Sequence, residues 1–258
     1  MTSPPVRPGA EAFSLGEGPV GVLMVHGFTG SPASTRPIGA WLASQGIAVE
    51  GVRLPGHGTS IDDLRNRRWI EWVDEAGRGL DALRACCRTV VAFGQSMGGA
   101  VVLRLVASRP GDVEGIALAN PYVFDARHLV IPVGRLFLRE VGGVANDIAK
   151  PGQDENADER MPVPAVAEMA AMLRHVRREL GSIRIPAVIF VSGADHVLPK
   201  GSARKVYERL GSEPKELVPC PRSYHVVTLD HDAPLVGERV LALARALDAG
   251  RAGSEVSG

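Results

Sequence analysis

"VAFGQSMGGAVVLRL", at residues 91–105, places a serine between glycines, after an apolar run and before a stretch with helical spacing. Gly94 and Gly98 flank Ser96 in the pattern G-x-S-x-G, and Gly99 follows. A sharp turn from a strand into a helix needs small residues at these positions, and it lifts the serine hydroxyl to where a base can reach it. The helix that follows directs N–H groups toward the same point, which favours negative charge there. We therefore predict that Ser96 is a nucleophile; the alternative is a loop whose glycines only make the turn.

Outward from this turn, short apolar runs alternate with helical segments along most of the chain. Several runs are continuously apolar and β-branched, which is typical of strands buried on both faces of a parallel sheet. The alternation predicts βαβ units, and hence an α/β fold with a mostly parallel central sheet and helices on both faces. The predicted strands are residues 20–27, 46–54, 88–94, 113–120, 187–193 and 215–220.

One interval breaks this alternation. About 65 residues separate the strand that ends near residue 120 from the next clear strand, which begins near residue 187. The interval holds an apolar piece (128–141), a polar stretch (150–160) and an amphipathic helical pattern. Because the chain must return to the same sheet, we expect one domain over residues 1–258 with a cap insertion at about 122–182 that covers the strand ends.

Composition excludes several classes of function. The 258 residues carry a formal net charge of +0, so no electrostatic argument points to nucleic acid. No apolar run approaches the ~20 residues that cross a bilayer, and residues 1–13 have no signal-peptide pattern. We expect a cytoplasmic protein without stable membrane insertion, as a monomer or a small homo-oligomer.

No cofactor or metal is expected. Cys86 and Cys87 are adjacent and Cys220 is alone, which is neither a disulfide framework nor a zinc spacing. "GEGPVG" (16–21) matches a dinucleotide fingerprint in letters only. It precedes a strand and opens no helix, whereas the fingerprint needs a strand before it and a helix after it.

A serine hydroxyl needs a base to take its proton and an acid to orient that base. In this arrangement the chain order is serine, acid, histidine. His225 follows the last predicted strand and is the predicted base; His231, between two aspartates at the start of the last helix, is interpreted as a cap or surface residue. The other histidines precede Ser96, lie in the insertion or adjoin the acid: His26, His57, His128, His175 and His196.

Asp195 is the predicted acid, because it lies just past the carboxyl end of a strongly apolar strand, where open parallel sheets form their sites. An ordinary turn aspartate is the alternative reading of Asp195, and Asp125 is the alternative acid. For the oxyanion, two N–H donors are needed. We predict the N–H groups of Met97 and of Phe28, the latter in the glycine-containing loop "HGFTGSP" (26–32).

These segments together resemble the α/β-hydrolase superfamily, and more narrowly the small bacterial carboxylesterases and monoacylglycerol lipases. The resemblance covers roughly residues 20–245. It rests on "HGFTGSP", "LPGHGTS", "GQSMGG", "PAVIFVSGADHVLP" and "SYHVVTLDHD", in that order.

This resemblance implies a triad of Ser96, Asp195 and His225, with Phe28 and Met97 as oxyanion donors. In monoacylglycerol lipases of this type a cap glutamate helps to hold the glycerol head group. "DERMP" (158–162) is similar to that place, so the match is Glu159; a solvated acidic loop is the alternative.

The expected function is hydrolysis of small-molecule carboxylic esters of one acyl chain through an acyl-enzyme on Ser96, as in a monoacylglycerol lipase or carboxylesterase. The alternatives are a thioesterase or another acyl-transfer enzyme with the same triad, and a ligand-binding protein without turnover. Apolar residues of the expected cap could line an acyl pocket or pack as the cap's own core. They are Leu129, Ile131, Leu136, Phe137, Met169 and Leu173.

Overall fold

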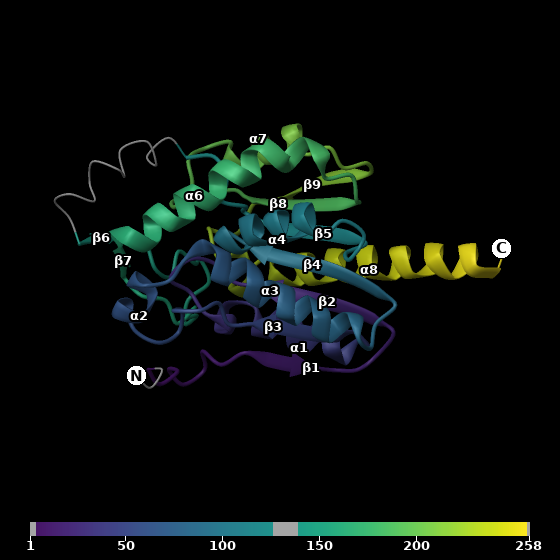
Figure 1. The fold of residues 1–258 in the computed structure, drawn as a ribbon, viewed down its shortest axis with the longest axis horizontal. Coiled ribbons are helices and arrows are strands. Elements are labelled where there is room, and N and C mark those ends of the chain that lie inside the picture. Colours follow the sequence, from purple (N-terminus) through teal and green to yellow (C-terminus); the bar gives the residue numbers. More distant parts are fainter. Residues whose placement is uncertain (1–3, 126–138, 257–258) are drawn as a thin grey trace.

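Seven strands form the central sheet in the computed structural model, which describes residues 4–125 and 139–256 (Figure 1). Their order across the sheet is β1-β3-β2-β4-β5-β8-β9. β1 is antiparallel to β3, and the other neighbouring pairs are parallel. The strands are β1 (Phe13–Leu15), β2 (Val20–Val25), β3 (Ala48–Val52), β4 (Thr89–Gln95), β5 (Gly115–Ala119), β8 (Ala187–Ser192) and β9 (Lys215–Cys220).

All six predicted strands are present, so the predicted α/β class with a mostly parallel sheet is confirmed. β1 was not predicted, because its three residues are too few to show a strand pattern. The connection from β2 leads to β3 on one side, and β4 then pairs with β2 on the other side. Crevices form at the carboxyl ends of strands where the order reverses in this way, so the loops after β2 and β4 meet there.

Each face of the sheet carries its own hydrophobic core. Along β2, Leu23 and Val25 belong to one cluster, whereas Val22 and Met24 belong to the other. All four side chains are fully buried. Burial on both faces explains why the strands are continuous apolar runs, and burying each such side chain contributes roughly 1.5–3 kcal/mol.

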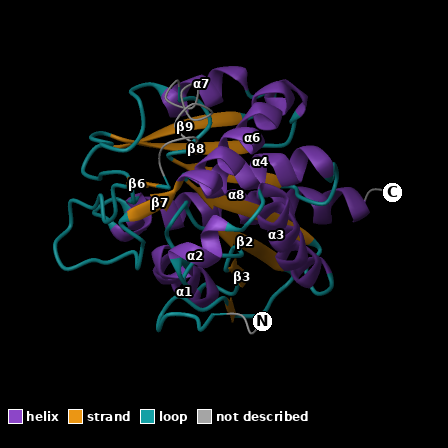
Figure 2. Ribbon diagram, turned by 60° about the vertical axis from the view of Figure 1, so that its left-hand side comes forward, coloured by secondary structure: helices purple, strands orange, loops and turns teal. Residues whose placement is uncertain are grey.

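Different helices cover the two faces (Figures 1 and 2). α3, α4, α6 and α7 pack on the face that holds Leu23, and α1 and α8 pack on the face that holds Met24. α7 was not predicted, because its sequence is mostly polar and only Ala203 and Val206 provide a buried apolar edge. The helices are α1 (Arg36–Ser44), α2 (Ile61–Arg65), α3 (Trp69–Arg84), α4 (Met97–Ser108), α6 (Val163–Glu179), α7 (Ser202–Arg209) and α8 (Ala233–Val256).

Residues 121–186, which lie between Asn120 at the end of β5 and the start of β8, are named here the inserted segment. It contains the antiparallel pair β6 (Glu140–Gly142) and β7 (Arg160–Pro162), and then α6, which packs against α3 and α4. Figure 1 shows β6 and β7 at one end of the molecule, beside α2.

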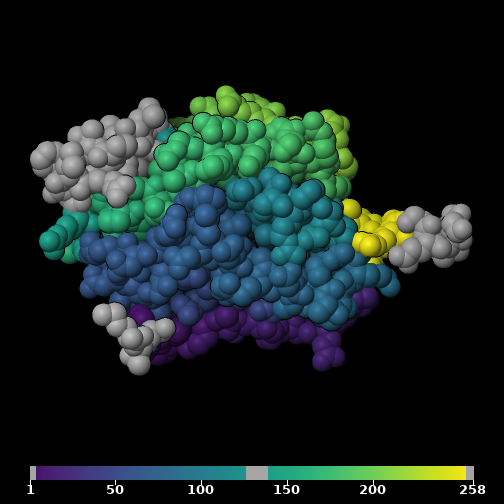
Figure 3. Space-filling view, in the orientation of Figure 1, coloured from purple at the N-terminus to yellow at the C-terminus, as the bar shows by residue number. Residues whose placement is uncertain are grey.

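Single-turn 3-10 helices complete the connections. They are η1 (Pro32–Ser34), η3 (Leu180–Ser182) and η4 (Val227–Leu229). α8 is the longest helix among the described residues, and it extends beyond the end of the sheet (Figure 1). The same helix projects from the body of the molecule in Figure 3. In the described parts of the chain, no helix combines the length and apolar character needed to cross a membrane.

Candidate functional site

Ser96 lies in a turn that the neighbouring glycines make possible. Its φ of 55° and ψ of −120° are rare for a residue with a side chain. A Cβ on Gly94 would lie 2.4 Å from the carbonyl oxygen of Gly98, and a Cβ on Gly98 would lie 2.2 Å from that of Val25. Only glycine fits at both positions, so β4 and α4 pass closely enough to hold the serine at the sheet edge. The turn is therefore the sharp strand-to-helix connection that the pattern predicts.

Ser96, His225 and Asp195 form a continuous chain of hydrogen bonds. The Oγ of Ser96 lies 2.9 Å from Nε2 of His225, and Nδ1 of His225 lies 2.8 Å from Oδ2 of Asp195. Ser96 and His225 are buried, at 8% and 6% exposure. They come from the loops after β4 and β9, and Asp195 comes from the loop after β8. The three predicted residues thus meet at the carboxyl edge of the parallel strands.

The carboxylate of Asp195 is held in its ionised form. Its Oδ1 accepts hydrogen bonds from the N–H groups of Val197 (2.9 Å) and Leu198 (2.8 Å), which leaves Oδ2 for His225. Burial alone would raise the pKa of Asp195, but these hydrogen bonds and the nearby imidazole outweigh it and lower that pKa. An ionised acceptor fixes the Nδ1–H tautomer of His225, so Nε2 is free to accept the proton of Ser96.

The alternative acid and two of the other histidines do not contact the Ser96–His225–Asp195 chain. Asp125 is buried and accepts a hydrogen bond from the hydroxyl of Tyr122 at 2.7 Å, whereas His225 faces Asp195. His231 is exposed, and its N–H donates to Asp230. His175 is exposed and its ring lies 5.3 Å from that of Trp69.

The loop after β2 runs beside Ser96. A Cβ on Gly27 would lie 3.3 Å from Cβ of Ser96, so the backbone that leads to Phe28 passes next to the hydroxyl. Within residues 4–125 and 139–256, neither the N–H of Phe28 nor that of Met97 donates a hydrogen bond. Both N–H groups are thus without an acceptor among the described residues.

Buried aromatic and imidazole rings brace this loop from behind. The ring of Phe28 packs against His57 and Trp72, at 5.8 and 6.0 Å between centroids. His26 donates from Nδ1 to the carbonyl of Gly27 (2.8 Å) and accepts at Nε2 from the N–H of Leu54 (3.1 Å). Burial lowers the pKa of His26 to about 4 and also lowers that of His57, so both rings are neutral at pH 7.

A cavity of about 350 Å³ opens in front of Ser96 and His225. The inserted segment contributes a mostly apolar wall to it, together with one carboxylate, that of Glu155. The apolar wall consists of Val141, Val144, Met161, Val166 and Met169. Leu173 is buried in the core instead. The remaining predicted pocket residues Leu129, Ile131, Leu136 and Phe137, and also His128, lie outside the described residues.

The carboxylate on this cavity is Glu155, not the predicted Glu159. Glu155 is 8% exposed, and its Oε1 accepts the N–H of Asn146 at 2.8 Å while its own N–H donates to Oδ1 of Asn146 at 2.9 Å. The Glu159 side chain is exposed and is not part of the cavity wall. Burial raises the pKa of Glu155. The sequence shows only an acidic run here, and nothing in it marks which carboxylate turns inward.

Two further buried aspartates link the inserted segment to the His225 loop, and neither was predicted from the sequence. Asp147 accepts the N–H of His225 on one oxygen and the ring of His196 on the other. Asp230 accepts the N–H groups of Ala149 (2.7 Å) and Lys150 (2.9 Å) from the inserted segment. The one available sequence signal for Asp230 is its place between the predicted base and the last helix.

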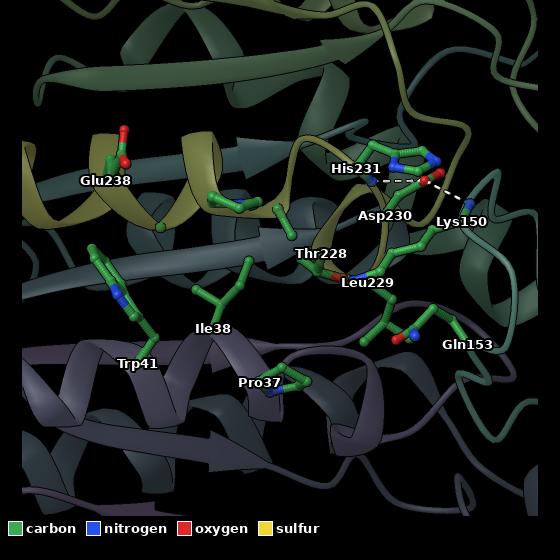
Figure 4. A pocket seen from close by; sticks show the side chains of 13 residues that line it. Pro37, Ile38, Trp41, Lys150, Gln153, Thr228, Leu229, Asp230, His231 and Glu238 are labelled. Atoms are coloured by element: carbon green, nitrogen blue, oxygen red, sulfur yellow. Dashed lines mark hydrogen bonds between the residues drawn. The ribbon is translucent and has the colours of Figure 1, made fainter.

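A second cavity, of about 400 Å³, lies between α1, α8 and the inserted segment (Figure 4). Trp41 and Glu238 line one part of it, and Lys150 and His231 line another. Figure 4 shows Asp230 bonded to the N–H groups of His231 and Lys150 at this edge. Ser96 and Asp195 are not in its wall, so it is separate from the catalytic candidates. Across the described residues, no group of three or more His, Cys, Asp or Glu side chains could hold a metal ion.

Comparison with known proteins gives concordant matches. The family model described as serine aminopeptidase, S33, matches residues 20–232. A thermostable monoacylglycerol lipase from Bacillus sp. (strain H-257) is 38% identical over 238 residues, which cover 92% of this chain and 95% of the lipase. The carboxylesterase of Bacillus subtilis (strain 168) is 25% identical over 242 residues, covering 92% of this chain and 96% of the esterase.

Among solved structures, one from work on LipS and LipT, two metagenome-derived lipolytic enzymes, superposes with a TM-score of 0.89. It is 32% identical and covers 94% of this chain and 100% of its own. The fold is therefore that of the α/β-hydrolases.

Proposed function

The chain belongs to the serine aminopeptidase S33 family of hydrolases, and from this membership we propose that it is a serine hydrolase of carboxylic esters with one acyl chain. The observation that carries the proposal is the bond chain from Ser96 through His225 to Asp195 at the edge of a mostly apolar cavity. The names of the relatives, a monoacylglycerol lipase and a carboxylesterase, support an ester rather than another acyl donor.

In the first half of the reaction, the Oγ of Ser96 attacks the ester carbonyl while Nε2 of His225 takes the hydroxyl proton. Asp195 keeps the ring oriented and stabilises the imidazolium that forms. The carbonyl oxygen becomes negative in front of the N–H groups of Phe28 and Met97. Each such donor is worth about 3–4 kcal/mol of transition-state stabilisation. His225 then passes its proton to the leaving alcohol, and the acyl group stays on Ser96.

The second half repeats the same steps with water. His225 takes a proton from water, the hydroxide attacks the acyl-enzyme, and the fatty acid leaves as Ser96 regains its proton. The inserted segment acts as a cap in this scheme: Met161, Val166 and Met169 face the acyl chain. Glu155 takes the head-group role expected of Glu159, because its Oε2 accepts no hydrogen bond within the described residues and can accept one from a glycerol hydroxyl.

The test is hydrolysis of 1-monoacylglycerols and of p-nitrophenyl esters from C4 to C18 by the wild type and by Ser96→Ala. We expect turnover of monoacylglycerols by the wild type, and a loss of about 10⁵-fold or more in kcat for the variant. As a control for folding, thermal unfolding of the variant should have the same midpoint as that of the wild type.

An alanine p-nitroanilide serves as the comparison substrate, because the family description names an aminopeptidase. Faster cleavage of the anilide than of any ester would overturn the ester assignment. Ester turnover that survives Ser96→Ala would overturn the nucleophile.

A further inference from the structure

One carboxylate of the inserted segment touches both loops that carry the partners of Ser96. Oδ2 of Asp147 accepts the N–H of His225 and the N–H of His196, each at 3.1 Å. Oδ1 of Asp147 lies 2.7 Å from Nδ1 of His196, and the main-chain carbonyl of Asp147 accepts the N–H of Val226 at 3.1 Å. Asp147 and His225 are buried, so the bond between them is shielded from competing water, whereas the His196 side chain is exposed.

The position of these bonds matters because His196 adjoins Asp195. The same oxygen therefore holds the peptide of the predicted base and the peptide next to the predicted acid. The separation of Asp195 and His225 is 2.8 Å between Oδ2 and Nδ1. A hydrogen bond weakens steeply as its donor and acceptor move apart or lose alignment, so a support that spans both loops contributes to its strength.

Hydrogen bonds from residues at the sheet edge hold the carbonyl groups of the His225 loop. The amide of Asn120, at the end of β5, donates to the carbonyl of His225 at 2.8 Å and to Oγ of Ser192 at 2.7 Å. That hydroxyl donates to the carbonyl of Tyr224 at 2.6 Å. The carbonyl of His225 thus accepts a hydrogen bond from the sheet edge, and its N–H donates one to Asp147 of the inserted segment.

Asp147 is also joined to the cavity wall. Its neighbour Asn146 exchanges two hydrogen bonds with Glu155, whose carboxylate lies on the cavity. A carboxylate that lines the cavity is therefore joined to Asp147 through its neighbour Asn146.

We propose that Asp147 is a positioning residue that fixes the spacing of Asp195 and His225. This inference rests on the proposed function. It adds a residue that touches neither the substrate nor the reacting atoms but acts through His225.

The experiment compares Asp147→Ala, Asp147→Asn and the matched control Asp158→Asn. Asp158 is an aspartate of the same inserted segment, but it binds Arg7 at 2.6 Å instead of the His225 loop. The readouts are kcat and KM for a 1-monoacylglycerol, and the low-field proton resonance of the His225–Asp195 hydrogen bond, which needs no substrate.

Asp147→Ala removes every side-chain bond, so kcat should fall about 100-fold, the size expected for misplacement of a reacting group by about 1 Å. KM should change by less than about threefold, because Asp147 makes no substrate contact. The low-field resonance should weaken or vanish. Asp147→Asn keeps one oxygen for the two N–H groups and should restore kcat to within about tenfold of wild type. Asp158→Asn should match the wild type, and Asp147→Asn keeps the test decisive if the alanine variant unfolds.

A kcat within twofold of wild type for Asp147→Ala would overturn the proposal, as would a raised KM at unchanged kcat. Equal losses in Asp147→Ala and Asp158→Asn would also overturn it, because they would mean that docking of the segment in general is what matters. If the wild type cleaves no ester, the proposed function fails, and the resonance in the variants still decides whether Asp147 positions His225.

Discussion

The β4–α4 turn and the inserted segment meet at one cavity, but different forces hold them in place. The turn is fixed by backbone packing: Gly94 and Gly98 lie where any side chain would strike another main chain. The polar part of the inserted segment is fixed by side chains that reach main-chain groups far away in sequence, such as Asp147 on His225 and Asp230 on Ala149. The nucleophile therefore sits on the region fixed by backbone packing, and the substrate-facing wall sits on the region tied by polar bonds.

The largest expected effect is the loss of stability from a glycine-to-alanine substitution in the β4–α4 turn, compared with the same substitution in the inserted segment. Gly98→Ala puts a methyl group 2.2 Å from the carbonyl oxygen of Val25 and 2.5 Å from that of His26. Because both are backbone atoms, we expect the free energy of unfolding to fall by about 3 kcal/mol or more. Gly181→Ala in the inserted segment meets nothing within 4 Å, so its change should stay within about 0.5 kcal/mol. Urea unfolding measures the free energy of unfolding of both variants. Equal losses of stability in Gly98→Ala and Gly181→Ala would contradict the prediction.

The buried imidazoles behind the loop after β2, which lies beside the turn, and the buried carboxylates at the site should respond to acid at different pH. His26 and His57 are buried with lowered pKa values, about 4 for His26 against 6.5 unfolded, so the unfolded chain binds more protons between these values. Stability should be complete above pH 6.5 and decline as the pH falls toward 4. The slope is about 1.4 kcal/mol per pH unit for each histidine. Asp195 and Asp230 have lowered pKa values, and their contributions are lost only below about pH 4.

Urea unfolding at pH 7.5, 6 and 5 tests this order. His57→Phe removes one of the two titrating rings, so its slope should be about half that of the wild type if the fold is kept. A free energy of unfolding that stays constant between pH 7.5 and 5 would contradict the prediction that protonation of the buried histidines destabilises the fold in this range.

The smallest effect should fall on the substrate wall alone. Glu155→Gln replaces an inward-facing carboxylate by an amide of the same shape, which accepts a hydroxyl hydrogen bond less strongly. We expect kcat/KM for a 1-monoacylglycerol to fall about tenfold, the equivalent of one charge-assisted hydrogen bond. p-Nitrophenyl butyrate, which has no glycerol, should be cleaved within about twofold of the wild-type rate. Glu159→Gln is the control and should leave both rates unchanged; a loss there instead would restore the assignment made from sequence.

The same contrast explains which parts could be predicted from sequence. Ser96 was identifiable because a tight turn imposes glycines next to it in the chain. Asp195 and His225 were identifiable because a parallel sheet brings the ends of its strands to one edge. Glu155 and Asp147 were not, because their partners follow from how a polar stretch without periodicity docks onto the sheet. Such bonds leave no spacing to detect: Asp147 and His225 are 78 residues apart.

Asp147 lies in the inserted segment and binds the His225 loop, whereas Asp230 lies after His225 and binds the inserted segment. This crossed pair of contacts has a consequence for local unfolding. Neither the stretch around Ala149 nor the His225 loop can leave without breaking bonds donated to both carboxylates. The two stretches should therefore open as one cooperative unit. In native-state hydrogen exchange, the amides of Ala149, Lys150, Tyr224 and His225 should share a single opening free energy, and urea should lower it with a single slope.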